Sequence, residues 1–163
     1  MIYIGIDPGL SGAVGILTDI DPYVRAEIFD TPTMVVSGIK EKRVYNKVGM
    51  ASILQSYRDR TDVLVVLEAV HAMPKQGVSS SFTFGKGLGI WEGIIAALGL
   101  PLEMPSPQRW KKEMLADQGK EKAAARFKAM ALFPNIATQF SRVKDDGRAE
   151  AILMAEYGKR LRK

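Results

Sequence analysis

The chain has 163 residues, 47% of them hydrophobic and 25% charged, which is typical of a globular protein long enough to bury one core. It has no Cys and one His, which excludes disulfides, cysteine zinc sites and histidine-rich metal sites. Its net charge of +5 is uneven, because residues 1–107 carry −2 and residues 108–163 carry +7. A basic segment on a near-neutral body is typical of nucleic-acid-binding proteins, although a solvated basic surface has the same composition.

The first thirty residues predict a meander of three strands. Residues 2–7 alternate between Ile and other residues with the period of a strand, and Asp7-Pro8-Gly9 is a turn signal. Residues 11–18 return as a second strand, and residues 23–29 form a third. Asp7 therefore lies at the end of the first strand, where it either only opens the turn or serves a site.

The rest of the chain alternates helices and strands. Residues 30–47 are polar and are predicted to be a loop, whereas the unbroken apolar run within residues 62–70 predicts a strand buried on both faces. We expect a further loop at 71–81, a short strand at 101–104, and helices at 48–58, 84–98, 105–115, 120–133 and 146–161. This order predicts an α/β fold of the ribonuclease H-like type, a mixed five-stranded sheet flanked by helices, in one domain spanning residues 1–163.

Acidic residues fall where such a fold places functional groups. Glu68 ends the buried run VLVVL, where an unpaired carboxylate is costly, and Asp7 ends the first strand. Asp146 and Glu150 lie four residues apart on one face of the last predicted helix. The alternative without a site is that Asp146 only stabilises the N-terminus of this helix and Glu150 is exposed to solvent. If the three segments meet, four carboxylates suit two Mg²⁺ ions roughly 3.5–4 Å apart, as in phosphodiester hydrolysis.

Three stretches in this order resemble the RuvC-type Holliday junction resolvases: GIDPGLSG, VVLEAV and DDGRAEAILMAEYG. LEAVHAMPKQGVSSSF and KDDGRAEA are closest to the phage and chloroplast branch of that family. The resemblance implies a homodimeric Mg²⁺-dependent endodeoxyribonuclease, with Mn²⁺ able to substitute, that makes two symmetric nicks in a four-way DNA junction. It implies that Asp7, Glu68, Asp146 and Glu150 are the catalytic metal ligands. The bacterial housekeeping enzymes of the family usually place the last two acidic or histidine ligands three residues apart, whereas here the clear pair is four apart, so Asp145 is an alternative to one of them.

Binding residues and the dimer are predicted from several segments. Small residues recur every four positions at Gly85, Gly89, Gly93 and Ala97, which suits either a helix pair across a two-fold axis, with Ile90, Trp91 and Ile94 beside it, or packing on the sheet. Met73, Pro74 or Phe82 is a candidate wedge between bases. Arg148 is predicted either to contact phosphate or to pair with an acid, and His71 is either a DNA contact or a satisfied loop residue. The predicted DNA contacts are His71, Lys75, Ser79, Ser80, Lys111, Lys120, Lys122 and Arg148.

Other functions remain as alternatives. A ribonuclease H-like nuclease acting on flapped DNA or structured RNA would share these features, as would a DNA-binding module without catalysis. An actin-like phosphotransferase would need a second domain, for which 163 residues leave no room. We expect no nucleotide cofactor and no membrane partner. The chain lacks a signal or transit peptide and a long apolar segment, which predicts a cytoplasmic protein of a bacterial or phage-infected cell, or an organellar one in a eukaryote.

Overall fold

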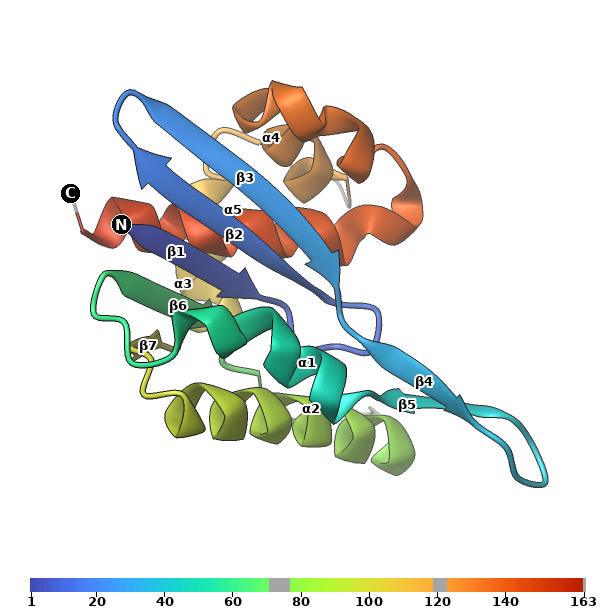
Figure 1. Cartoon of the computed structure of the whole chain (residues 1–163). Helices are drawn as coiled ribbons and strands as arrows, with labels where there is room; N and C mark the ends of the chain where they lie inside the picture. Colours follow the sequence, from blue (N-terminus) through green and yellow to red (C-terminus); the bar gives the residue numbers. More distant parts are fainter. Residues whose placement is uncertain (71–76, 119–122, 163) are drawn as a thin grey trace.

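The computed structural model describes residues 1–70, 77–118 and 123–162. A five-stranded sheet in the order β3-β2-β1-β6-β7 forms its centre (Figure 1). The strands are β1 (Ile2–Ile6), β2 (Ala13–Ile20), β3 (Tyr23–Asp30), β6 (Val63–Leu67) and β7 (Leu102–Glu103). β1, β2 and β3 pair antiparallel, whereas β6 runs parallel to β1 and β7 parallel to β6. The predicted mixed sheet is confirmed.

Helices cover both faces of the sheet (Figure 1). One face carries α1 (Lys47–Leu54), the short 3₁₀ helix η1 (Gln55–Tyr57) and α2 (Val78–Ala97). The other carries α3 (Pro107–Met114), α4 (Ala124–Leu132), η2 (Pro134–Phe140), η3 (Val143–Asp145) and α5 (Asp146–Leu161). No helix in the described ranges is long and apolar enough to cross a membrane.

The alternation of β1 divides its side chains between two cores. Ile2, Ile4 and Ile6 pack with α1 and α2, and the intervening Tyr3 packs with α3, α4 and α5. Both faces of β6 are buried in the same way, as its unbroken apolar run predicts. Trp91 is 0% exposed in the first of these cores, so the prediction that it borders a dimer surface is wrong.

The loops predicted at 30–47 and 71–81 are each wrong in part. Within residues 30–47 the chain forms an antiparallel pair, β4 (Thr33–Val36) and β5 (Lys42–Tyr45), that projects from the body as an arm (Figure 1). Its side chains are mostly exposed, so it lacks the buried alternation that identifies a strand in sequence. Helix α2 begins at Val78 rather than at residue 84, because residues 79–81 are serines and the apolar Val78 and Phe82 are exposed, so no buried face marks the start of the helix.

Candidate active site

Asp7 and Glu68 emerge side by side at one edge of the sheet. In the parallel pairing of β1 with β6, Ile6 lies opposite Leu67, so the next residue of each strand is one of the two acids. The Glu68 backbone N–H continues the ladder by donating to the Ile6 carbonyl at 3.3 Å. The expectation that these two strands are neighbours and bring the two acids together is therefore confirmed.

Helix α5 brings a third carboxylate to this edge. Its first turn lies against Asp7 so closely that a Cβ on Gly147 would come 2.9 Å from Asp7 Oδ2 and 2.6 Å from the Ser11 carbonyl. Glu150 lies three residues further along, on the same side of the helix. Its charge is close enough to act on both Asp7 and Glu68. Asp7, Glu68 and Glu150 are called the acidic cluster below.

Asp7 is the most perturbed member of the acidic cluster. Burial is the main reason that its pKa rises from 3.8 to about 7, and the charges of Glu150 and Glu68 raise it further. The Gly9 backbone N–H, which donates to Asp7 Oδ1 at 3.2 Å, and the positive charge of Lys111 lower the pKa. Without a stronger cation than Lys111, the cluster therefore holds a proton near neutral pH.

Glu68 has a partner that the sequence analysis missed. Its side chain is 7% exposed, and burial is the main reason that its pKa is raised. The indole Nε1–H of Trp110 donates to Glu68 Oε1 at 3.0 Å and favours the charged form. Trp110 is 0% exposed, and a Trp within the polar helix PQRWKKEM was the signal available in the sequence. The indole fixes one carboxylate oxygen of Glu68 and leaves the other for a ligand.

Lys111 supplies the positive charge of the site. Its Nζ lies 2.6 Å from Glu150 Oε1 and 5.1 Å from the centre of the Trp110 ring. Burial lowers the pKa of Lys111, but the charge of Glu150 and its hydrogen bond, with the charges of Glu68 and Asp7, more than offset this and raise it. The sequence predicts a DNA contact for Lys111, whereas in the structure its ammonium neutralises part of the acidic cluster.

The acidic cluster fits a divalent metal by its chemistry. Hard carboxylate oxygens are the ligands that Mg²⁺ and Mn²⁺ prefer, and a dication would relieve the like-charge repulsion that raises the pKa of Asp7 and Glu68. As arranged, no three His, Asp or Glu side chains in residues 1–70, 77–118 and 123–162 lie close enough together to hold an ion. A metal would therefore have to replace Lys111 as the partner of Glu150.

Asp146 and Asp145, the candidates for a fourth ligand, have cationic partners of their own. Asp146 Oδ1 lies 2.8 Å from Arg126 Nε, an ion pair in which neither atom makes a hydrogen bond. Asp145 is 1% exposed and accepts from the Arg142 guanidinium at 2.9 Å, and these hydrogen bonds are the main reason that its pKa is lowered. Asp146 as a ligand stays a prediction that requires its carboxylate to leave Arg126.

The remaining predicted binding residues are spread around this edge. Arg148 Nε and a terminal guanidinium nitrogen each donate to Asp30 at 2.6 Å, so this arginine pairs with an acid. Ser79 and Ser80 lie exposed in the first turn of α2, beside a groove that also contains Leu10 of the β1–β2 turn. Their contact with DNA stays a prediction. The other candidates, His71, Lys75, Lys120, Lys122, Met73 and Pro74, lie outside the described residues.

Replacing Lys111 by Met tests its role as a counter-charge. At pH 8 in EDTA we expect the variant to lose about 1 kcal/mol of unfolding free energy, because Glu150 then lies beside two other acids without its cation, while the pair is partly exposed. The loss corresponds to a melting temperature roughly 3 °C lower. It should shrink toward pH 5 as Asp7 takes up a proton. Lys112→Met on the same helix is the control, and equal melting temperatures for the two variants at pH 8 would contradict this role.

Comparison with solved structures gives the fold. The Thermus thermophilus RuvC structure matches with a TM-score of 0.62 at 16% sequence identity, over 99% of this chain and 96% of that one. The chain has the RuvC fold. T. thermophilus RuvC in complex with a Holliday junction substrate matches this RuvC fold with a TM-score of 0.60, at 15% identity and the same coverage. The ribonuclease H-like fold predicted from the order of elements is thereby confirmed.

Sequence comparison extends the resemblance to the RuvC-type family. The chloroplastic Holliday junction resolvase MOC1 of Chlamydomonas reinhardtii is 29% identical over 91 residues. The match covers 56% of this chain and 10% of that protein, so the chain spans a small part of its curated relative. No protein-family model matches. The RuvC-type resemblance read from the three acidic motifs is supported by a relative of the same named class.

Proposed function

We propose that this chain is a Holliday junction resolvase, a metal-dependent DNA endonuclease that makes paired symmetric nicks in four-way junctions. The observation that carries the proposal is the convergence of Asp7, Glu68 and Glu150 at the carboxyl edge of β1 and β6 in a RuvC fold. The curated relative is named as a Holliday junction resolvase, and a RuvC of the same fold has been solved with a junction substrate. We propose that residues 1–163 act as one nuclease domain.

The acidic cluster provides oxygens for a divalent cation, with Mg²⁺ as the physiological ion and Mn²⁺ as a substitute. When bound, such ions lower the pKa of water and neutralise charge on the phosphate, and two of them suit in-line hydrolysis. Trp110 holds Glu68 in place by its hydrogen bond, and the Gly9 N–H holds Asp7. Lys111, released from Glu150, is positioned to attract a phosphate of the substrate. Asp146 is proposed as the fourth ligand after it leaves Arg126.

We propose that two copies assemble through α2. A Cβ at Gly85, Gly89 or Gly93 would meet nothing within 4 Å, so this stripe of small residues does not pack against the described parts of its own chain. The half-buried Ile90 and Ile94 border it. Two such helices can approach closely around a two-fold axis, and a two-fold enzyme suits a junction with two equivalent strands.

Gly89→Arg should separate the dimer while it leaves the fold intact. The new side chain meets no atom of its own chain within 4 Å of its Cβ, and replacing a mid-helix Gly favours the helix by up to about 1 kcal/mol. Light scattering after size exclusion should give the monomer mass with an unchanged or higher melting temperature. Ala131→Arg, at an exposed position of α4, is the control. A dimer mass for Gly89→Arg would place the interface elsewhere.

The decisive experiment for the function is a cleavage assay with the purified chain and Mg²⁺. A synthetic immobile four-way junction is compared with linear duplex, flapped DNA and an RNA hairpin, and both nicks are mapped at nucleotide resolution. We expect paired nicks at symmetry-related positions of the junction and little cutting of the duplex. Preferential cutting of the flap or the RNA would instead assign a different ribonuclease H-like nuclease, and binding without cutting would assign a non-catalytic module.

A further inference from the structure

The β4–β5 arm and the N-terminal half of α2 form a groove next to the acidic cluster. Its cavity has a volume of about 440 Å³ and runs between the arm, the start of α1 and α2. A second hollow of about 420 Å³ continues it and shares Tyr45 and Thr83 with it. The second hollow reaches Leu10 in the turn that follows Asp7. These two hollows together are called the arm groove below.

The rim of the arm groove is positively charged. Lys42, Arg43, Lys47 and Lys86 line the larger hollow, and among the described residues no Asp or Glu lines either hollow. None of the ion pairs among the described residues uses Lys42, Lys47 or Lys86. Unpaired cations around one hollow are complementary to a polyanion rather than to a second copy of the same basic surface.

The floor of the arm groove is apolar and partly aromatic. Met34 and Val44 are cross-strand partners on one face of the arm and line the larger hollow together with Val48 and Phe82. Phe82 is 74% exposed and Val48 is 77% exposed, so large apolar side chains there lack a covering partner within the described chain. Double-stranded DNA presents phosphates and sugars to such a surface, whereas unpaired bases offer flat apolar faces that stack on aromatic rings.

The arm is held in a fixed relation to the acidic cluster. The Arg43 guanidinium donates to the Leu10 carbonyl and, at 2.9 Å, to Ser11 Oγ, and the Tyr45 hydroxyl donates to the Pro8 carbonyl at 3.2 Å. All three acceptors belong to the turn between Asp7 and β2. A strand lying in the arm groove would therefore lie next to the turn that follows Asp7.

We infer that the arm groove binds single-stranded DNA, with the lysines on its phosphates and Phe82 stacked on a base. The inference rests on the proposed function and deepens it. It extends the substrate class to branched DNA in which one strand is unpaired beside the cut. Ser79 and Ser80, which line the inner hollow, are placed to donate hydrogen bonds to the same strand.

Fluorescence anisotropy of the full chain with a labelled 20-nucleotide dT strand in EDTA tests the inference. Lys42→Ala/Lys86→Ala should weaken binding about tenfold and reduce the slope of log K against log salt by about 1.4, the value for two lost phosphate contacts. Phe82→Ala should weaken binding several-fold with an unchanged salt slope, since stacking is lost and charge is kept. The control Arg25→Ala/Arg58→Ala removes the same charge from exposed positions outside the groove and should bind like the parent chain.

Two outcomes would overturn the inference. One is that both double variants lose the same affinity or neither loses any, because binding would then be unrelated to the arm groove. The other is that the groove variants halve the mass measured by light scattering, because a second copy would then be its occupant. Junction cutting is measured on the same samples. If the parent chain cuts no junction and the groove variants lose dT binding, the proposed function is contradicted and this inference is kept. If the parent chain cuts junctions and the groove variants keep their dT binding, this inference is contradicted and the proposed function is kept.

Discussion

Asp7→Asn is expected to abolish DNA cleavage while it leaves junction binding intact. The charges of both other carboxylates in the acidic cluster raise the pKa of Asp7, so Asp7 lies between them and its loss removes a central metal ligand. A Lewis-acid contribution of several kcal/mol corresponds to a rate at least about 10³-fold lower. Asn keeps the oxygen that accepts from the Gly9 N–H and makes the site less negative, so junction affinity measured in Ca²⁺ or EDTA should stay the same or rise.

The same substitution should stabilise the metal-free protein. The pKa of Asp7 is about 7 in the folded chain and 3.8 in the unfolded chain, so the folded chain binds the proton of this carboxyl more tightly. Its stability in EDTA therefore falls as pH rises from about 4 to 7, and the full cost is present above pH 7. Asn cannot ionise, so at pH 8 we expect a gain of up to about 4 kcal/mol, or roughly 10 °C. The gain should vanish near pH 4.

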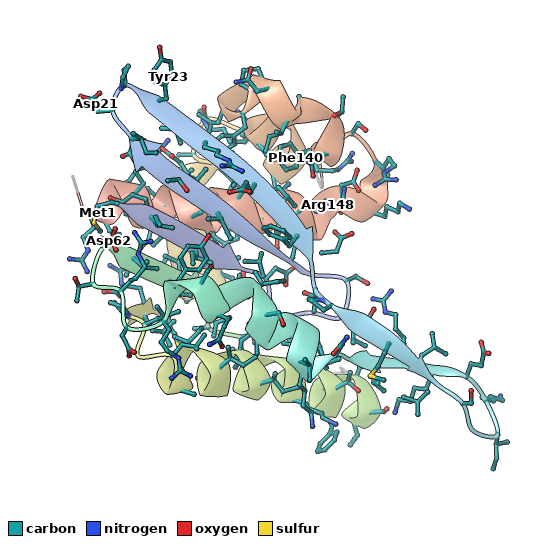
Figure 2. The ribbon with its side chains drawn as sticks, viewed as in Figure 1. Met1, Asp21, Tyr23, Asp62, Phe140 and Arg148 are labelled. Carbon is teal, nitrogen blue, oxygen red and sulfur yellow. The ribbon has the colours of Figure 1, made fainter. Side chains whose placement is uncertain are left out.

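Asp62→Asn provides the control for both measurements. Asp62 precedes β6 at the end of the sheet opposite to Glu68, beside Met1 (Figure 2), and its carboxylate is exposed and paired with Arg60. This variant should cut junctions at the parental rate and gain no stability at pH 8. An Asp7→Asn chain that still nicks junctions, or that melts below the parent at pH 8 in EDTA, would contradict the assignment of Asp7 to a strained metal site.

Asp7 and Glu68 could be predicted because the hydrophobic pattern of the sequence shows where their strands end. Ile2, Ile4 and Ile6 alternate and VLVVL is unbroken, so both the positions of Asp7 and Glu68 and the parallel character of the second strand follow from periodicity. What remained open was whether the two strands are neighbours, since pairing of distant segments leaves no local trace. The register of Ile6 with Leu67 supplies that answer.

The arm and Trp110 were missed because their signals are weak for different physical reasons. The arm lies outside the core, so its β-branched residues are exposed on both faces and carry no burial period. Trp110 contacts Glu68 from 42 residues away, and a sequence shows only that a large aromatic interrupts a polar helix.

Asp146 shows the limit of helical spacing as an argument. Residues four apart differ by about 40° in direction, which places Asp146 and Glu150 on one face but not in one site. The close contact of Gly147 with Asp7 fixes the rotation of α5, and Asp146 then faces Arg126 of α4. The packing between helices determines which cation pairs with a carboxylate. The i, i+4 spacing alone does not predict that partner.

Gly5→Ala should be among the most destabilising single-methyl substitutions in the described residues. A Cβ on Gly5 would come 2.1 Å from the Ala151 carbonyl oxygen and 2.4 Å from the Ala155 nitrogen, both in the backbone of α5. Gly15 is the cross-strand partner of Gly5, and a Cβ added to Gly15 would come 2.7 Å from Ile152 Cα. The two glycines therefore form a notch in the sheet against which α5 packs. Backbone cannot rotate away as a side chain can, so we expect a loss of about 3 kcal/mol or more and a melting temperature roughly 10 °C lower.

The loss should reach the acidic cluster as well, because α5 carries Glu150. A helix displaced from the notch moves this carboxylate away from Asp7, so the cleavage rate of Gly5→Ala should fall at temperatures where the chain is still folded by circular dichroism. Gly38→Ala is the matched control, since its Cβ would have only an ordinary 3.7 Å contact with the Lys40 carbonyl. If Gly5→Ala melted within 2 °C of that control, α5 would not lie against β1, and Glu150 would lose its place beside Asp7 and Glu68.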